Sequence, residues 1–87
     1  MENLLVTVGS ITTATRLEKL LRKNKGVASR VIHTPAQISG GGCSYSIITN
    51  RSNMIYVRET AHENSIKIRG YYIETVNRGE KQYHVIS

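Results

Sequence analysis

The 87-residue sequence predicts one α+β domain, in which two helices cover one face of an antiparallel sheet. Two observations predict this fold. Short apolar runs rich in Val, Ile and Leu alternate with one clear and one weaker helical pattern. The resulting order is strand-helix-strand-strand-helix-strand, and turn residues near the C-terminus add a further strand. No apolar run approaches the ~20 residues of a membrane span, so we expect no membrane association.

The first strand and the first helix have clear boundaries. Residues 4–8 form a short apolar run, typical of a buried strand, that ends at Gly9. Ser10 or Thr12 is a suitable N-cap for the helix that follows. Gly26, after two basic residues and an Asn, is expected to end this helix in the left-handed conformation. The residues at helical spacing that should face the core are Ala14, Leu17, Leu20 and Leu21.

The second and third strands flank a glycine-rich loop. Residues 27–32 predict the second strand, and Pro35 blocks its continuation because proline has no N–H to donate. Residues 45–49 predict the third strand. The chain between them contains Gly40, Gly41 and Gly42 directly before the only cysteine, Cys43, and we expect an open loop there.

The second half predicts a weaker helix and two strands. Ser52 or Asn53 is the expected helix start, and residues 66–73 predict a fourth strand in which Gly70 interrupts the alternation and marks a bulge. Residues 74–87 form a C-terminal extension, because Asn77-Arg78-Gly79 between two apolar runs is typical of a hairpin. The residues expected on the inner side of the second helix are Met54, Val57 and Ala61.

This element order is the ferredoxin-like pattern, in which two split β-α-β units interlock. The pattern predicts where the cysteine lies. The first two strands run parallel, so the loop after the second strand shares a sheet end with the start of the first helix. We therefore expect Cys43 near Gly9 and Ser10.

The lone cysteine predicts a chemical site. A helix N-terminus, open backbone N–H groups and a positive overall charge each favour the thiolate, which is the reactive form of cysteine. The alternative is a buried, inert Cys43, although three preceding glycines disfavour tight packing. One cysteine closes no intramolecular disulfide, and the N-terminus shows no signal-peptide pattern, so we expect a cytoplasmic location.

His33 is the second candidate, since an imidazole beside a thiol lowers the thiol pKa or moves its proton. The alternative is a surface histidine at a strand end. A Cys-His-acid triad is disfavoured because no acid is identifiable near the loop. One cysteine and three scattered histidines predict no metal site.

The chain carries twelve Lys and Arg against six Glu, for a formal net charge of +6. This balance favours acidic partners, but the charges are scattered along the sequence. Three interpretations stay open. They are a solvated surface, a docking face for an acidic protein, and a nucleic-acid interface.

The chain between the second and third predicted strands reads Thr34-Pro35-Ala36-Gln37-Ile38-Ser39, then a few small residues and Cys43, and a short apolar strand follows. This pattern resembles the signature of the selenium/sulfur carrier protein-like family. The resemblance runs from about Leu4 to Ile73. Family members usually have Gly after the cysteine, whereas this chain has Ser44 there and its glycines before it.

The resemblance implies a relay protein without a cofactor or independent turnover. Cys43 would accept a sulfane sulfur or selenium atom from a desulfurase or a selenocysteine lyase and pass it to an acceptor enzyme. Backbone amides of the loop would stabilise the terminal anion. The residues expected to support the loop are Gly40, Gly41, Gly42, Ser44, Ser10, His33, Thr34 and Pro35.

The alternative function is binding without chemistry. Ferredoxin-like sheets present aromatic and basic side chains to single-stranded RNA, and four tyrosines fall on predicted strands. The RNP-type aromatic motif is absent, which makes nucleic acid the weaker partner. A third alternative is an interaction module whose edge strand pairs with another chain.

Overall fold

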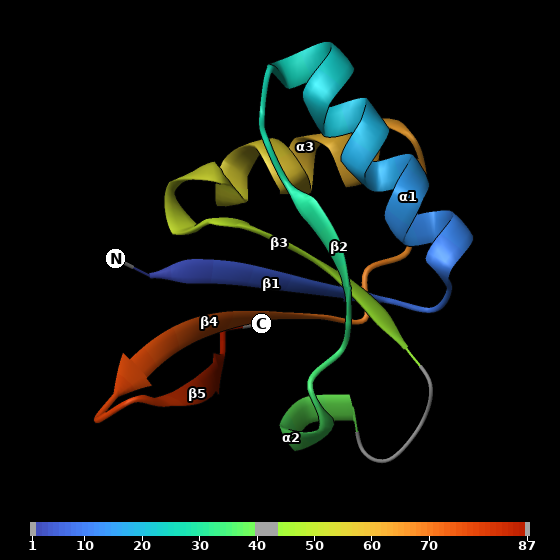
Figure 1. Cartoon of the computed structure of the whole chain (residues 1–87). Helices are drawn as coiled ribbons and strands as arrows, with labels where there is room; N and C mark the ends of the chain where they lie inside the picture. The colour runs from blue at the N-terminus through green and yellow to red at the C-terminus, as the bar shows by residue number, and fades with distance from the viewer. Residues whose placement is uncertain (1, 40–43, 87) are drawn as a thin grey trace.

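Five strands form one sheet in the computed structural model, which describes residues 2–39 and 44–86 (Figure 1). The strands are β1 (Asn3–Val8), β2 (Arg30–His33), β3 (Tyr45–Asn50), β4 (Gly70–Asn77) and β5 (Glu80–Val85). The helices are α1 (Ile11–Leu20), α2 (Ala36–Ser39) and α3 (Met54–Glu63). A π-helical turn, η1 (Leu21–Lys25), extends α1, and a 3-10 turn, η2 (Arg51–Asn53), precedes α3.

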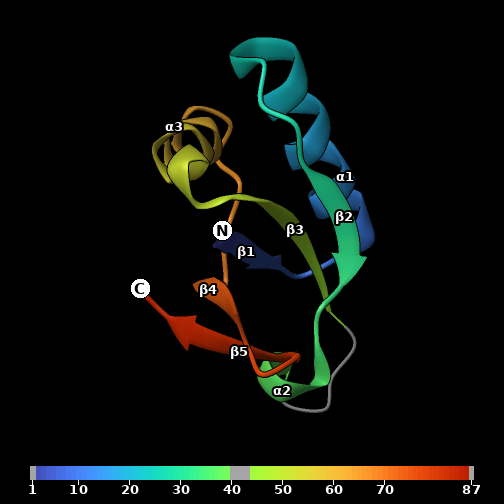
Figure 2. The ribbon, with the colours of Figure 1, turned by 60° about the vertical axis from the view of Figure 1, so that its left-hand side comes forward.

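The strand order is β2-β3-β1-β4-β5, and every neighbouring pair is antiparallel. β1 and β2 are therefore parallel to each other on either side of β3, as in a split β-α-β unit. α1 and α3 cover the same face of the sheet (Figures 1 and 2). The fold is thus of the ferredoxin-like α+β type, with β5 as an added edge strand.

The core lies between the sheet and these two helices. Leu4, Val6 and Val8 alternate along β1 toward α1 and α3, and all three are fully buried. Leu5 and Thr7 occupy the other face of β1 and are buried as well. The buried residues that meet β1 from the helices, the loops and the other strands are Ala14, Leu17, Leu21, Val27, Ile47, Val57, Ala61, Ile66 and Ile73.

α1 begins and ends as its sequence predicts. The Ser10 side chain accepts a hydrogen bond from the Thr13 N–H at 3.1 Å, which is an N-cap. Gly26 has φ +67° and ends the helix in the left-handed region. The Val27 N–H then donates to the Leu21 carbonyl at 3.1 Å.

β2 starts later than the sequence predicts. Val27 belongs to the helix end through its bond to Leu21, and its side chain is buried in the core. The strand therefore occupies Arg30–His33 rather than residues 27–32. Val27 favours a strand by its residue type, but it also suits the position after a helix end, where an apolar side chain packs into the core. In this chain Val27 takes the second role.

The predicted bulge at Gly70 is wrong. β4 begins at Gly70, and its register with β1 is continuous from Thr7↔Gly70 to Asn3↔Glu74. Ile66 and Ile68 lie before the strand, where they pack on the core. A Cβ on Gly70 would stand 3.0 Å from the Tyr72 ring, so close approach explains this glycine.

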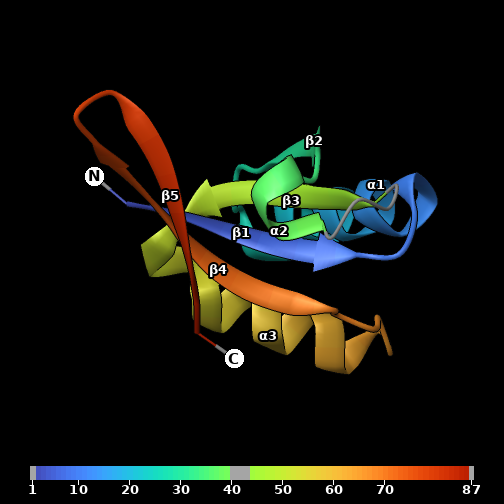
Figure 3. The same ribbon diagram turned by 90° about the horizontal axis from the view of Figure 1, so that it is seen from below.

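The predicted C-terminal hairpin is confirmed. β4 and β5 pair from Tyr72↔Val85 to Asn77↔Glu80. Arg78 and Gly79 connect them with φ of +53° and +80°, the signature of a two-residue type I′ turn. Figure 3 shows this hairpin extending away from the helices. No helix in the described part of the chain is long and apolar enough to cross a membrane.

Candidate functional site

The segment that carries the cysteine joins β2 to β3. Cys43, Gly40, Gly41 and Gly42 lie outside the described residues, so their predicted positions stay predictions. The residues on either side are described: His33, Thr34 and Pro35 leave β2, and Ser44 leads into β3.

Hydrogen bonds join the two ends of this segment. The Thr34 N–H donates to the Ser44 carbonyl at 3.1 Å. The Thr34 and Ser46 hydroxyls are 2.8 Å apart, and Ser46 is fully buried. These bonds continue the β2–β3 ladder beyond its last pair, His33↔Tyr45. Ser44, the residue after Cys43, is therefore anchored to the sheet.

A short helix that was not expected from the sequence, α2, follows Pro35 directly. The Ile38 and Ser39 N–H groups both donate to the Pro35 carbonyl at 3.0 Å. The resulting α2 lies on the face of the sheet opposite α1 and α3 (Figures 1 and 3). The missed signal is Thr34-Pro35 itself, because proline is common where a helix begins.

His33 lies at the strand end, exposed, as in the alternative interpretation of this residue. Its ring contacts the Tyr45 ring with centroids 4.7 Å apart and planes inclined by 37°. Tyr45 is itself partly buried against the core. The structure thus gives His33 an aromatic neighbour, which the sequence spacing did not indicate.

Ser10 and the segment ends share one end of the sheet. Val8, the last residue of β1, pairs with Tyr45, the first residue of β3. Ser10 follows two residues later and caps α1. This arrangement agrees with the topology from which the proximity of Cys43 to Gly9 and Ser10 was predicted, and that proximity itself stays a prediction.

The tyrosines that suggested an RNA-binding sheet are divided between its two faces. Tyr45 and Tyr71 pair with Val8 and Val6 and pack toward the helices. The Arg58 guanidinium lies 4.7 Å above the Tyr71 ring. Burial raises the pKa of Tyr71, and the positive charge of Arg58 partly opposes this. Only two of the four, Tyr72 and Tyr83, occupy the face free of α1 and α3.

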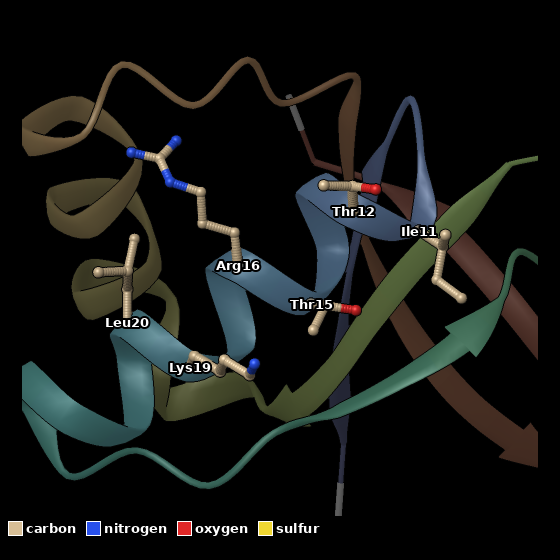
Figure 4. Close-up of a pocket in the computed structure, with 6 residues that line it drawn as sticks. All are labelled: Ile11, Thr12, Thr15, Arg16, Lys19 and Leu20. Carbon is tan, nitrogen blue, oxygen red and sulfur yellow. The ribbon is translucent and has the colours of Figure 1, made fainter.

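A hollow of about 570 Å³ runs along α1 and contains none of the predicted site residues. Figure 4 shows its lining, all from α1: Ile11, Thr12, Thr15, Arg16, Lys19 and Leu20. Ile11 is 51% exposed although it is apolar. Within residues 2–39 and 44–86, no three His, Cys, Asp or Glu side chains group as a metal site would require.

A family model described as "Putative Se/S carrier protein-like" matches residues 3–73. The match covers most of the 87-residue chain and spans Cys43 and both ends of its segment. The chain belongs to this Se/S carrier protein-like family. Comparison with curated proteins and with solved structures finds no significant match.

Proposed function

We propose that the chain carries a sulfane sulfur or a selenium atom on Cys43. The observation that carries this proposal is the family match over residues 3–73, whose name describes carriage of these two elements. Cys43 is the only cysteine in the chain, so it is the only thiol able to hold either atom. A single thiol also suits a carrier, because no second thiol of the same chain releases the cargo by forming a disulfide.

The transfer is an exchange at sulfur. The Cys43 thiolate attacks the terminal sulfur of a donor persulfide, R–S–SH. One S–S bond forms and one breaks, Cys43 becomes Cys43–S–SH, and the donor leaves as the thiolate R–S⁻. The proton stays on the terminal sulfur, and no external oxidant is consumed. The same exchange on R–S–SeH gives Cys43–S–SeH.

The anchoring of the neighbouring residues supports this role. Thr34 binds the carbonyl of Ser44, and its hydroxyl binds buried Ser46, so the chain directly after Cys43 is held to the sheet. Transfer between two sulfur atoms requires a reproducible approach geometry. An anchored flank limits how many orientations the incoming donor must sample.

The donor in this proposal is a desulfurase or a selenocysteine lyase with the atom bound to its own cysteine, and an acceptor enzyme removes the atom. The chain itself performs no independent turnover. We place the exchange in the cytoplasm, where thiols stay reduced.

Intact mass spectrometry after incubation with a cysteine desulfurase and cysteine tests the proposal. We expect a gain of about 32 Da on the wild-type chain, and of about 80 Da with a selenocysteine lyase and selenocysteine, each reversed by a thiol reductant. The matched control is Cys43→Ser, which should gain nothing. A wild-type chain that gains no mass while the donor is loaded, or a Cys43→Ser chain that gains the same mass, would contradict the proposal.

A further inference from the structure

A polar pocket of about 270 Å³ lies where the start of α1 meets the segment from α3 to β4. Figure 4 shows Arg16 extending from α1 toward α3, on the side away from Ile11. The residues of the lining that matter for its chemistry are Gly9, Thr13, Arg16, Ser65, Lys67 and Arg69.

The pocket gathers positive charge without compensation. Arg16, Lys67 and Arg69 line it, and no acidic residue does. Within residues 2–39 and 44–86, none of these three cations forms an ion pair. Five of the six acidic residues there are paired with other cations: Glu2 with Arg51, Glu18 with Arg22, Glu59 and Glu63 with Lys25, and Glu74 with Lys81. The sixth, Glu80, begins β5 and does not line the pocket.

Contacts within the fold position both arginines of the pocket. The Arg69 side chain lies against Gly9, with one nitrogen 3.5 Å from the position that a Cβ on Gly9 would occupy. The main-chain N–H of Arg69 donates to the Thr7 carbonyl at 2.8 Å, which fixes the base of that side chain. Arg16 donates to the Asn64 carbonyl at 3.4 Å. Both groups keep further N–H donors for a ligand, since a guanidinium carries five.

We propose that this pocket binds a small phosphate-class oxyanion. Guanidinium groups match the oxygen atoms of phosphate in paired hydrogen bonds, and a lysine adds a point charge. Three like charges within one small pocket repel one another until an anion neutralises them. A volume of about 270 Å³ suits a phosphate group and is too small for a folded peptide segment.

The anion is either free phosphate or the phosphate group of a nucleotide. This site goes beyond the proposed carrier function and does not depend on Cys43. A Cys43→Ser chain should therefore bind the anion as the wild type does, even if carriage of sulfur or selenium fails its own test.

The test is a titration of the ¹⁵N-labelled chain with inorganic phosphate, followed by amide NMR shifts at constant ionic strength with chloride as the reference anion. We expect saturable shifts confined to the amides of residues 9–13 and 65–69. A second titration with adenosine monophosphate separates the two sources. Tighter binding than phosphate assigns a nucleotide, and equal or weaker binding assigns the free anion.

Matched variants make the site falsifiable. Arg69→Gln should raise the dissociation constant for the bound probe about tenfold, because it removes a charge-assisted pair. Arg78→Gln removes the same charge in the β4–β5 turn and should change it less than about twofold. Equal weakening by both variants, or shifts that fail to saturate with either probe, would overturn the proposal.

Discussion

Glu74 is a buried carboxylate that depends on three neighbours. It lies on β4 with 5% of its surface exposed. Asn3 donates to it at 3.1 Å and the Tyr83 hydroxyl at 3.0 Å, while the Lys81 ammonium lies 4.0 Å away. A buried charge is tolerated only when its oxygen atoms are hydrogen-bonded. The sequence of β4 alone does not show which residues surround Glu74. The strand register does, because it places Asn3 and Tyr83 opposite Glu74.

Replacement of Tyr83 by Phe should lower the free energy of unfolding by about 1 kcal/mol at neutral pH, because Glu74 loses a donor. Burial raises the pKa of Tyr83, and the hydrogen bond to Glu74 and its charge raise it further. The folded state thus binds the Tyr83 proton more tightly than the unfolded state, and its contribution to stability is lost as pH rises above about 10. Urea unfolding across this pH range measures the effect.

The difference between wild type and Tyr83→Phe should therefore shrink above about pH 10. Tyr56→Phe is the control, since Tyr56 is exposed on α3. If the Tyr83→Phe chain loses stability with rising pH as steeply as the wild type, ionisation of Tyr83 does not cause that loss.

Among the helices and strands, the predicted boundaries agree with the structure where a helix cap is visible in the sequence and differ elsewhere. Ser10 and Gly26 mark the ends of the α1–η1 helix because caps are local chemistry that the sequence shows directly. The start of β2 was predicted too early, since the bond from Val27 to Leu21 spans six residues. The four-residue α2 is too short to produce a helical period, which left Thr34-Pro35 as its only signal.

Gly26→Ala should lower the free energy of unfolding by about 1 kcal/mol. The reason is the backbone alone, because Gly26 has φ +67° and nothing lies within 4 Å of an added Cβ. Gly26→Asn is the matched control and should cost less, since Asn tolerates the left-handed region. Thermal unfolding followed by circular dichroism compares the two variants, and equal losses would contradict the conformational explanation.

The ferredoxin-like arrangement and the C-terminal hairpin could be predicted from the sequence, but the basic pocket could not. The α1 residue Arg16 and the cations Lys67 and Arg69 are about fifty positions apart, so they appear scattered along the sequence. Only the packing of α1 beside the α3–β4 segment brings them to one pocket. Ion pairs between distant positions, such as Glu2 with Arg51, likewise emerge only from the fold.

A chain that ends at Asn77 should still fold but with lower stability. The family match ends before β5, and β5 pairs only with β4. The loss of Tyr83 and Lys81 leaves Glu74 under-paired, at a cost of about 1–3 kcal/mol. Far-UV circular dichroism and thermal unfolding test this expectation. Adding Glu74→Gln to the shortened chain should recover part of the loss, and a shortened chain that is unfolded or as stable as the wild type would contradict it.

The two-residue turn at Arg78 and Gly79 limits how the length of this chain can vary. Side chains alternate between the faces of a strand, so one inserted residue would turn Tyr83 to the opposite side of the sheet and separate it from Glu74. An insertion of two residues would restore the side but shift the pairing along β4. Relatives that keep a buried carboxylate at this position are therefore expected to keep this turn at a constant length.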